Sequence, residues 1–207
     1  TFIKFGQLLS VRPDLIPKEY AQELEKLQDK VPPVSFKDVK AIIEAEFGKS
    51  IEHLFSDFEK NPIASASISQ VHKATLKTGQ KVAVKVQRPY AKDIMETDIE
   101  ILSYFARLLE KKAEKVRRFR PVKIVNEFKE WTEKELDFRL EARNAKRFYQ
   151  NFKGSKTVHI PEIYDKFTTE KILTLEFIDG VELHNIKEIK KRKLHFNEII
   201  KNGFDAI

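Results

Sequence analysis

Apolar residues recur at helical spacing at the start of the chain. Phe2, Phe5 and Leu9 predict one helix that ends before Pro13, and Pro17 opens a second helix, since proline suits the first helical turn. The chain is therefore expected to begin with two short helices.

A third helix is predicted from the signals at both of its ends. Ser35 is a good N-cap because its hydroxyl can accept a backbone N–H that the helix leaves unpaired. Gly48 stands where a glycine commonly closes a helix in the left-handed conformation. Between them the apolar positions keep the helical period at Val39, Ile42, Ile43 and Phe47.

The hydrophobic period changes from helical to alternating at about Phe55. Residues 68–76 and 81–87 alternate as strands and are joined by a predicted hairpin turn at 77–80. Helical spacing then returns, and two more strands precede a last helix. The predicted later helices are 91–116, 121–152 and 195–207, and the later strands are 158–168 and 171–178.

Composition narrows the class of protein. Hydrophobic residues make up 41% of the 207 residues, enough for a packed core. The chain has no cysteine, which excludes disulfides, thiolate metal sites and cysteine nucleophiles and fits a reducing compartment. No stretch approaches the ~18 apolar residues of a membrane span, and Thr1 in place of Met indicates a chain that begins within a longer protein. We expect a cytoplasmic location, with peripheral membrane attachment as the alternative.

Basic residues outnumber acidic ones by 39 to 32, and the excess is gathered in two runs. Neither run interleaves aromatic residues as a nucleic-acid platform would. We interpret both as solvated surface and expect no nucleic-acid partner. The runs are Lys111, Lys112, Lys115, Arg117, Arg118, Arg120 and Lys123, and Lys187, Lys190, Lys191, Arg192 and Lys193.

The first candidate for chemistry is the lysine of the strand VAVK. Val82 and Val84 face one way on an alternating strand, so Ala83 and Lys85 face the other. A small residue two positions before a lysine leaves room for a flat ring, with an ammonium in reach of phosphates. Taken alone, the pattern fits an ordinary outward-facing lysine more often.

Two flanking stretches strengthen the functional interpretation. Small residues crowd the stretch 64–74 (ASASISQVHKA), where a phosphate-covering loop would lie. Downstream, a predicted helix places Asp137, Glu141 and Phe148 on one face. The two carboxylates would form a like-charge pair four residues apart, at a cost of a few tenths of a kcal/mol. A cation such as Lys85 would remove that cost; a solvated acidic helix face is the alternative.

A predicted apolar strand runs into Glu-Phe-Ile-Asp-Gly at the end of 172–180. Main-chain N–H and C=O groups of Glu176, Phe177 and Ile178 are expected to hydrogen-bond an adenine edge, as the hinge of a kinase does. A small-residue loop, a strand lysine, a helix glutamate and this hinge follow the order of a kinase small lobe.

Together these motifs resemble the UbiB family of atypical kinases, also called aarF-domain-containing kinases. The stretch KFGQLLSVRPDLIP (4–17) is similar to the family's KxGQ motif, and VAVKVQRP (82–89) follows. Glu135-Leu136-Asp137 matches the ExD motif, with an EAxN at Glu141 to Asn144. Ser69 stands where the family often has glycine or alanine.

The resemblance implies an α+β fold. It would be a protein kinase-like small lobe, with an antiparallel sheet plus helices, after a helical KxGQ extension and before the start of a helical large lobe. The implied division is 1–54 for the extension, 55–180 for the small lobe with a helical insertion at 91–133, and 181–207 for the start of the large lobe.

The resemblance also implies a role for each motif residue. Lys85 would contact the phosphates of ATP or ADP, and Glu141 would hold it. Lys4 and Gln7 would fold over the site and meet the ExD carboxylates, occluding the groove that a peptide substrate would use. The nucleotide would be covered by Ala64, Ser65, Ala66, Ser67, Ile68, Ser69 and Ala83.

The family is tied to the biosynthesis of ubiquinone and other isoprenoid lipids at membranes. The implied activity is therefore that of an atypical kinase or ATPase. The implied partners are a nucleotide and, in addition, membrane lipid or lipid-biosynthesis proteins. No motif predicts an oligomeric state.

A kinase-type site also needs a catalytic-loop aspartate, a downstream asparagine and a metal-binding aspartate. His195, Asn197 and Asn202 copy that spacing with asparagine for aspartate, but the 14 residues of 181–194 are too few for two large-lobe helices. We expect this chain alone to be inactive and Mg²⁺ to require the large lobe. No metal site is predicted, because no metal-ligand spacing connects His53, His72, His159, His184 and His195.

Two other classes stay open. A pseudokinase scaffold would bind nucleotide or a partner without turnover. A basic helical module for lipid or nucleic acid would show a steep salt dependence and no nucleotide effect.

Overall fold

The computed structural model describes residues 1–12, 16–25, 31–183 and 185–206. Pro13, the predicted end of the first helix, lies outside the described residues, as do His184 and Ile207.

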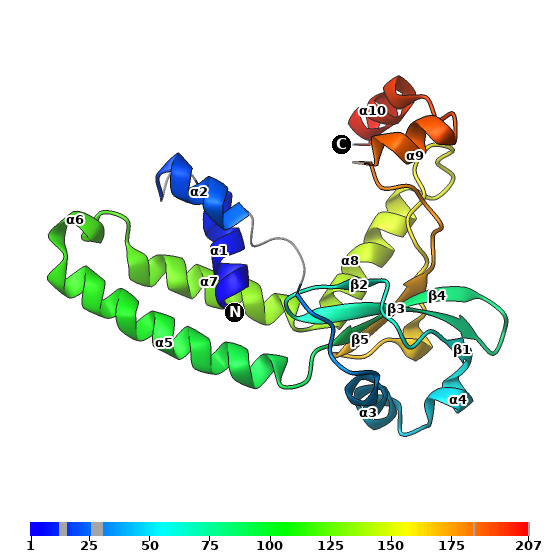
Figure 1. Ribbon diagram of the computed structural model, residues 1–207, viewed down its shortest axis with the longest axis horizontal. Coiled ribbons are helices and arrows are strands. Elements are labelled where there is room, and N and C mark those ends of the chain that lie inside the picture. The colour runs from blue at the N-terminus through cyan, green and yellow to red at the C-terminus, as the bar shows by residue number, and fades with distance from the viewer. Residues whose placement is uncertain (13–15, 26–30, 184, 207) are drawn as a thin grey trace.

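Five antiparallel strands form one sheet (Figure 1). β3 (Ser69–Leu76) and β4 (Lys81–Gln87) pair as a hairpin. Gly79 turns the chain between them at a φ of 93°, which glycine adopts without strain. The strand order is β1-β3-β4-β5, with β2 added beside β3. The remaining strands are β1 (Phe55–Phe58), β2 (Ala64–Ser65) and β5 (Ile172–Glu176).

Helices cover both faces of the sheet (Figure 1). α3 (Phe36–Phe47) and α4 (Ile51–Leu54) lie on one face, and α8 (Phe138–Asn151) lies on the other. α5 (Ala91–Lys112) and α7 (Pro121–Glu135) project from the sheet as a packed pair, with α1 (Phe2–Ser10) lying across them. The other helices are α2 (Lys18–Glu25), α6 (Glu114–Arg117), α9 (Ile186–Lys191) and α10 (Phe196–Asp205). The predicted α+β class is confirmed.

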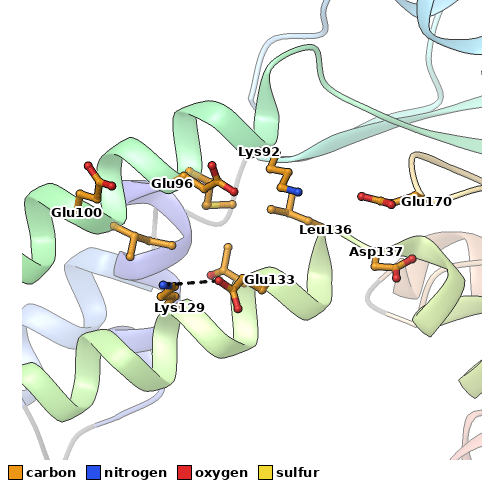
Figure 2. A pocket seen from close by; sticks show the side chains of 11 residues that line it. Lys92, Glu96, Glu100, Lys129, Glu133, Leu136, Asp137 and Glu170 are labelled. Carbon is orange, nitrogen blue, oxygen red and sulfur yellow. Dashed lines mark ion pairs between the residues drawn. The ribbon is translucent and has the colours of Figure 1, made fainter. Parts of the chain in front are cut away.

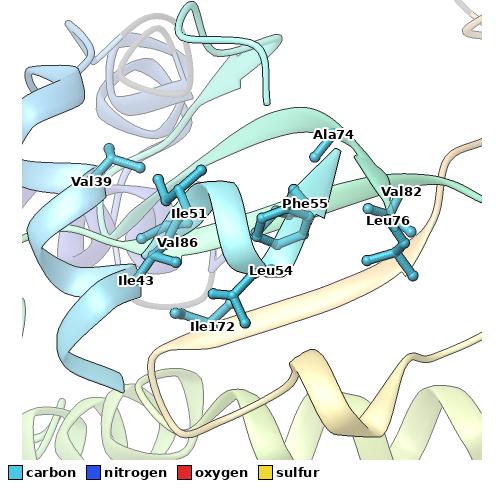
Figure 3. Packing of buried hydrophobic residues seen from close by; sticks show 11 residues of the cluster. Val39, Ile43, Ile51, Leu54, Phe55, Ala74, Leu76, Val82, Val86 and Ile172 are labelled. Atoms are coloured by element: carbon cyan, nitrogen blue, oxygen red, sulfur yellow. The ribbon is translucent and has the colours of Figure 1, made fainter. Parts of the chain in front are cut away.

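The main core fills the space between α3, α4 and the sheet (Figure 3). The alternation of β4 places Val82, Val84 and Val86 there, each fully buried. Ala83 and Lys85 consequently point to the opposite face, as predicted. Phe55 and Ile172 pack into the same cluster from the strands on either side.

The predicted caps of α3 are confirmed. The Ser35 hydroxyl accepts the Asp38 N–H at 3.3 Å, and Gly48 closes the helix in the left-handed conformation with a φ of 62°. These caps satisfy backbone groups that the helix itself leaves unpaired. α3 therefore begins and ends where the sequence indicates.

The prediction of one helix over 121–152 is wrong, because the chain breaks at Leu136–Asp137. Asp137 is the N-cap of α8, and its carboxylate accepts the Arg139 N–H at 3.0 Å. A short acidic side chain favours such a cap over a helix interior. Asp137 and Glu141 are therefore not a pair on one continuous helical face. The predicted helix 91–116 is interrupted likewise, at Ala113 between α5 and α6.

The predicted strand 158–168 is also wrong. Pro161 lacks the N–H that a ladder needs, and the segment makes a single bridge, between Ile163 and Leu175, before a 3-10 turn at Asp165–Phe167. The following strand is β5, shorter than the predicted 171–178. α9 lies where no element is predicted.

A buried polar network fixes the segment before α3 to the sheet. The Gln70 side chain accepts the Val34 N–H at 2.8 Å and lies 2.8 Å from His72 Nε2. His72 Nδ1 lies 2.8 Å from the Glu59 carbonyl oxygen. A neutral ring that donates from Nδ1 and accepts at Nε2 satisfies every contact. Burial lowers the pKa of His72 below its usual 6.5.

We expect this network to make stability pH-dependent. The unfolded chain takes up a proton at His72 near pH 6.5, whereas the folded chain resists it. Stability should therefore be constant above pH 6.5 and fall as the pH drops from 6.5 towards the lowered folded pKa, by up to ~1.4 kcal/mol per pH unit. His72→Gln should flatten this part of the curve. Calorimetric unfolding from pH 7.5 to 4.5 measures it, with the wild-type chain as the reference for the slope. An unchanged slope in His72→Gln would contradict the assignment.

Candidate functional site

The Lys85 ammonium lies between the sheet and α8. Its Nζ is 2.7 Å from Glu141 Oε2, which confirms the predicted ion pair between the two residues. The same Nζ lies 4.7 Å from the centroid of the Phe138 ring, a distance at which a cation is attracted to an aromatic face. The Lys85 side chain keeps 23% of its surface exposed, so the ammonium is held and remains accessible.

α8 is held in register with β4 by its neighbours. Phe138 is fully buried against Leu173 and Ala142, and its N–H donates to the Glu170 carbonyl at 3.0 Å. The Gln87 side chain donates to the Leu136 carbonyl at 2.6 Å, just before the helix. These contacts fix the start of α8, and Glu141 follows one turn later.

Asp137 does not join the Lys85 pair. Its carboxylate is bonded by Arg139 at 2.8 and 3.0 Å, and Arg139 also reaches Glu170 at 3.0 Å. The hydrogen bonds from Arg139 hold the pKa of Asp137 below its usual value. Asp137 was predicted to have Lys85 as its counter-charge, but Arg139 on the same helix supplies that charge.

Lys4 of α1 reaches the first carboxylate of the ExD motif. Its Nζ lies 2.9 Å from Glu135 Oε2 and 4.4 Å from the centroid of the Trp131 ring. The predicted contact of Lys4 with this motif is therefore confirmed for Glu135, while Asp137 stays with Arg139. Within the described residues, the Gln7 side chain makes no hydrogen bond to either carboxylate; its carbonyl accepts the Ser10 hydroxyl at 2.7 Å. We refer to Lys4, Trp131 and Glu135 as the clasp.

α1 is placed by apolar packing beneath the clasp. Phe5 meets Phe128 edge-on at 5.1 Å between ring centroids, and Leu8 packs on the same cluster. Gly6 is the buried residue of α1, which fits a helix pressed closely against its neighbour. Lys4 is therefore positioned by a packed helix.

The alanine-rich stretch forms a small hairpin. Ala64 and Ser65 pair with Val71 and Gln70 of β3, and the Ala66 N–H donates to the Ser69 carbonyl at 2.8 Å.

Two residues of the predicted loop Ala64–Ser69 are withdrawn from the surface. Ile68 packs in the core between α5 and α7, and its carbonyl accepts the Arg88 N–H at 2.8 Å. Ser69 is also buried. This leaves Ala64, Ser65, Ala66 and Ser67 as the part of the predicted loop that can face a ligand.

Arg88 fixes this loop, a role that was not predicted from the sequence. Its guanidinium donates to the Ala66 carbonyl at 2.8 Å, the Ser65 hydroxyl at 2.9 Å and the Pro32 carbonyl at 2.7 Å. Burial lowers the pKa of Arg88 below its usual value. The only available signal is its place at the end of VAVKVQRP, directly after the strand.

The residues of the predicted hinge are already partly paired. The Glu176 N–H donates to the Glu162 carbonyl at 2.8 Å, and the Phe177 N–H donates to the Lys81 carbonyl at 3.1 Å. Among the described residues, the N–H of Ile178 has no backbone partner. Of the three hinge N–H groups, the one on Ile178 is therefore available to a ligand.

Ala83 and Lys85 share one face of the sheet with the hairpin on one side and the hinge on the other. The grooves of about 440 and 660 Å³ lie elsewhere, between α5 and α7 and between α3 and the start of α5. Lys85 and the loop from Ala64 to Ser67 thus form an open wall, in which Ala83 is 9% exposed. In the described part of the chain, no three His, Asp or Glu side chains are grouped to hold a metal ion. No helix in the described ranges is long and apolar enough to cross a membrane.

Comparison with known proteins gives a consistent result. Residues 26–207 match the family model described as ABC1 atypical kinase-like domain. The chain is 39% identical over 204 residues to "Probable protein kinase UbiB" of Pseudomonas paraeruginosa, covering 99% of this chain and 38% of that one. The protein of the same name from Marinobacter nauticus is 37% identical over 204 residues, covering 99% and 37%. The chain thus spans less than two fifths of the length of these relatives.

A solved structure shares the fold. It is the Rv3197-erythromycin complex from Mycobacterium tuberculosis, which is 33% identical, with a TM-score of 0.65 over 88% of this chain and 46% of that chain.

Proposed function

Because the chain belongs to the ABC1 atypical kinase-like family, we propose that it forms the nucleotide-binding small lobe of a UbiB-like atypical kinase or ATPase. The observation that carries the proposal is the ion pair of Lys85 and Glu141 at 2.7 Å across the β4–α8 interface. In kinases such a pair fixes the lysine that contacts the phosphates of ATP.

The other parts of the wall suit a nucleotide whose phosphates lie at Lys85. Ala83 would lie against the adenine, and the unpaired N–H of Ile178 would donate to the adenine edge. The loop from Ala64 to Ser67, fixed by Arg88, would cover the phosphates. Alanine restricts positive φ, so this loop would contact phosphates differently from a glycine-rich one.

Mg²⁺ is expected to accompany ATP. Its protein ligands would come from residues in the part of the related proteins that this chain does not cover. The bound ion would neutralise phosphate charge. The chain's own contribution is to position the phosphates through Lys85 and to hold the lysine through Glu141.

We propose that the activity supports ubiquinone or related isoprenoid-lipid biosynthesis, by a protein attached peripherally to a membrane. Support comes from the UbiB name of the relatives. The clasp favours ATP hydrolysis or small-substrate chemistry over protein phosphorylation, because α1 would lie across the groove that a peptide needs.

Calorimetric titration with ADP and with ATP tests the proposal. We expect binding of at least one of them by this chain, with no turnover above background. Binding without turnover in the complete protein would favour the pseudokinase scaffold. Absence of nucleotide binding, together with binding to anionic vesicles that weakens steeply with salt, would favour the basic helical module.

Replacing Lys4 with alanine is expected to change nucleotide preference more than stability. The clasp is a partly exposed ion pair worth about 0–1 kcal/mol, yet it ties α1 to the ExD motif that directly precedes α8. The ratio of the dissociation constants for ADP and ATP should shift, while the unfolding midpoint stays nearly constant. Lys18→Ala, an exposed lysine on α2, is the control and should leave the ratio unchanged. A Lys4→Ala variant with the wild-type ratio would contradict a gating role.

A further inference from the structure

The groove between α5 and α7 has an apolar floor and an acidic rim (Figure 2). It encloses about 440 Å³, within the range of ligand pockets in proteins. Met95, Ile99 and Leu136 form the floor and are buried. It is separate from the wall that carries Lys85. α1 packs against the same two helices, but none of its residues lines the groove.

The lining carries more negative than positive charge, since five acidic side chains share it with the two lysines Lys92 and Lys129. In the described part of the chain, neither Glu96 nor Glu100 of α5 has an ion-pair partner. Glu133 is paired only with Lys129, at 3.9 Å, and both side chains are more than half exposed. At the end of the groove, Asp137 and Glu170 share Arg139, which lies outside the lining.

A second observation also indicates a ligand. Thr132 lines the groove and is fully buried, and its hydroxyl has no hydrogen-bond partner among the residues that the structure describes. A helical threonine usually bonds back to the carbonyl one turn earlier, and buried hydroxyls are rarely left unpaired. This hydroxyl retains both a donor and an acceptor site next to an acidic rim.

The spacing of the acids excludes a metal ion as the occupant, since no three acidic or histidine side chains in the described ranges are close enough to hold one. We propose that the groove binds an amphiphilic organic cation, a protonated amine carried on an apolar body. The apolar body would lie on Met95, Ile99 and Leu136, and the ammonium would meet Glu96 and Glu100 and donate to the Thr132 hydroxyl.

The Thr132 hydroxyl is closed to water in the structure, so a ligand must displace the side chains that cover it. The rim allows this movement: Glu96 and Glu100 are exposed, and the Lys129–Glu133 pair is long and solvated. Exposed pairs of this kind contribute little to stability, so their loss does not oppose binding strongly.

The test uses three matched probes with the ¹⁵N-labelled chain: octylamine, 1-octanol and octanoate. We expect octylamine to bind about tenfold or more tightly than 1-octanol, since a charged donor adds to the shared apolar contact. Octanoate should not bind. Octylamine should shift amide signals in α5 and α7 around Met95, Ile99 and Thr132.

Variants identify the groups involved. Glu96→Gln combined with Glu100→Gln should weaken octylamine about tenfold and leave 1-octanol unchanged. Thr132→Val, which keeps the shape, should weaken octylamine without lowering the unfolding midpoint. Glu130→Gln, an exposed acid of α7 outside the lining, is the control. Equal affinity for octylamine and 1-octanol, shifts that map elsewhere, or unchanged octylamine affinity in either variant would overturn the proposal.

Discussion

Lys85→Met should raise the dissociation constant for nucleotide by about 10- to 100-fold, the loss expected for charge-assisted hydrogen bonds to phosphate. Methionine keeps an apolar stem against Phe138 and removes the charge that lies 2.7 Å from Glu141. Stability should change little, because Glu141 is about half exposed and regains water. Calorimetric titration with ADP and ATP measures the affinity.

Two controls separate the Lys85 contact from a general charge effect. Lys77→Ala removes a positive charge from the exposed turn of the same hairpin and should leave nucleotide affinity unchanged. Glu141→Gln should weaken binding less than Lys85→Met, because the lysine then keeps its charge and loses only its support. Nucleotide affinity that survives Lys85→Met unaltered would show that phosphates bind elsewhere.

Phe128→Ala should lower the free energy of unfolding by about 3–5 kcal/mol, the usual loss for a buried phenylalanine. Phe128 is fully buried among Met95, Ile99 and Leu136 and meets Phe5 of α1 at 5.1 Å. The substitution removes the surface on which α1 packs. α1 should therefore undock, which also separates Lys4 from Glu135.

Urea unfolding measures the stability loss, and limited proteolysis detects an undocked α1 by cleavage within residues 1–12. The control is Phe148→Ala on α8, where the ring is 55% exposed and stacks on Phe152. Its expected loss is within about 1 kcal/mol. A Phe128→Ala variant that loses less than this, or that keeps α1 resistant to protease, would contradict the packing role.

Local patterns predict most of the fold in advance. The two caps of α3 and the alternation of β4 depend on nearest neighbours and are confirmed. The interruption at Asp137 is missed because the apolar residues keep the same helical period on both sides of it. The break depends on the Asp137 carboxylate, which accepts the Arg139 N–H and so caps a new helix. The segment 158–168 alternates like a strand, but Pro161 limits its ladder to one bridge.

The candidate site is predictable only where a motif fixes partners far apart in the sequence. Lys85 with Glu141, and Lys4 with Glu135, are found through the resemblance. Arg88 has no such signal, because its partners are main-chain carbonyls and a hydroxyl whose position depends on the tertiary fold. The same holds for the groove between α5 and α7, where an unpaired Thr132 hydroxyl is visible only once the helices are packed.

The clasp also sets an order of events during synthesis. Lys4 and Glu135 are 131 residues apart, and ribosomes add about 5–20 residues per second, so α1 waits roughly 7–26 s for its partner to be made. The β3–β4 hairpin needs only neighbouring residues and can form well within that interval. During the wait, Phe5 and Leu8 lack Phe128 and Leu136, the part of their packing surface that is made last, and α1 stays open to capture by a chaperone.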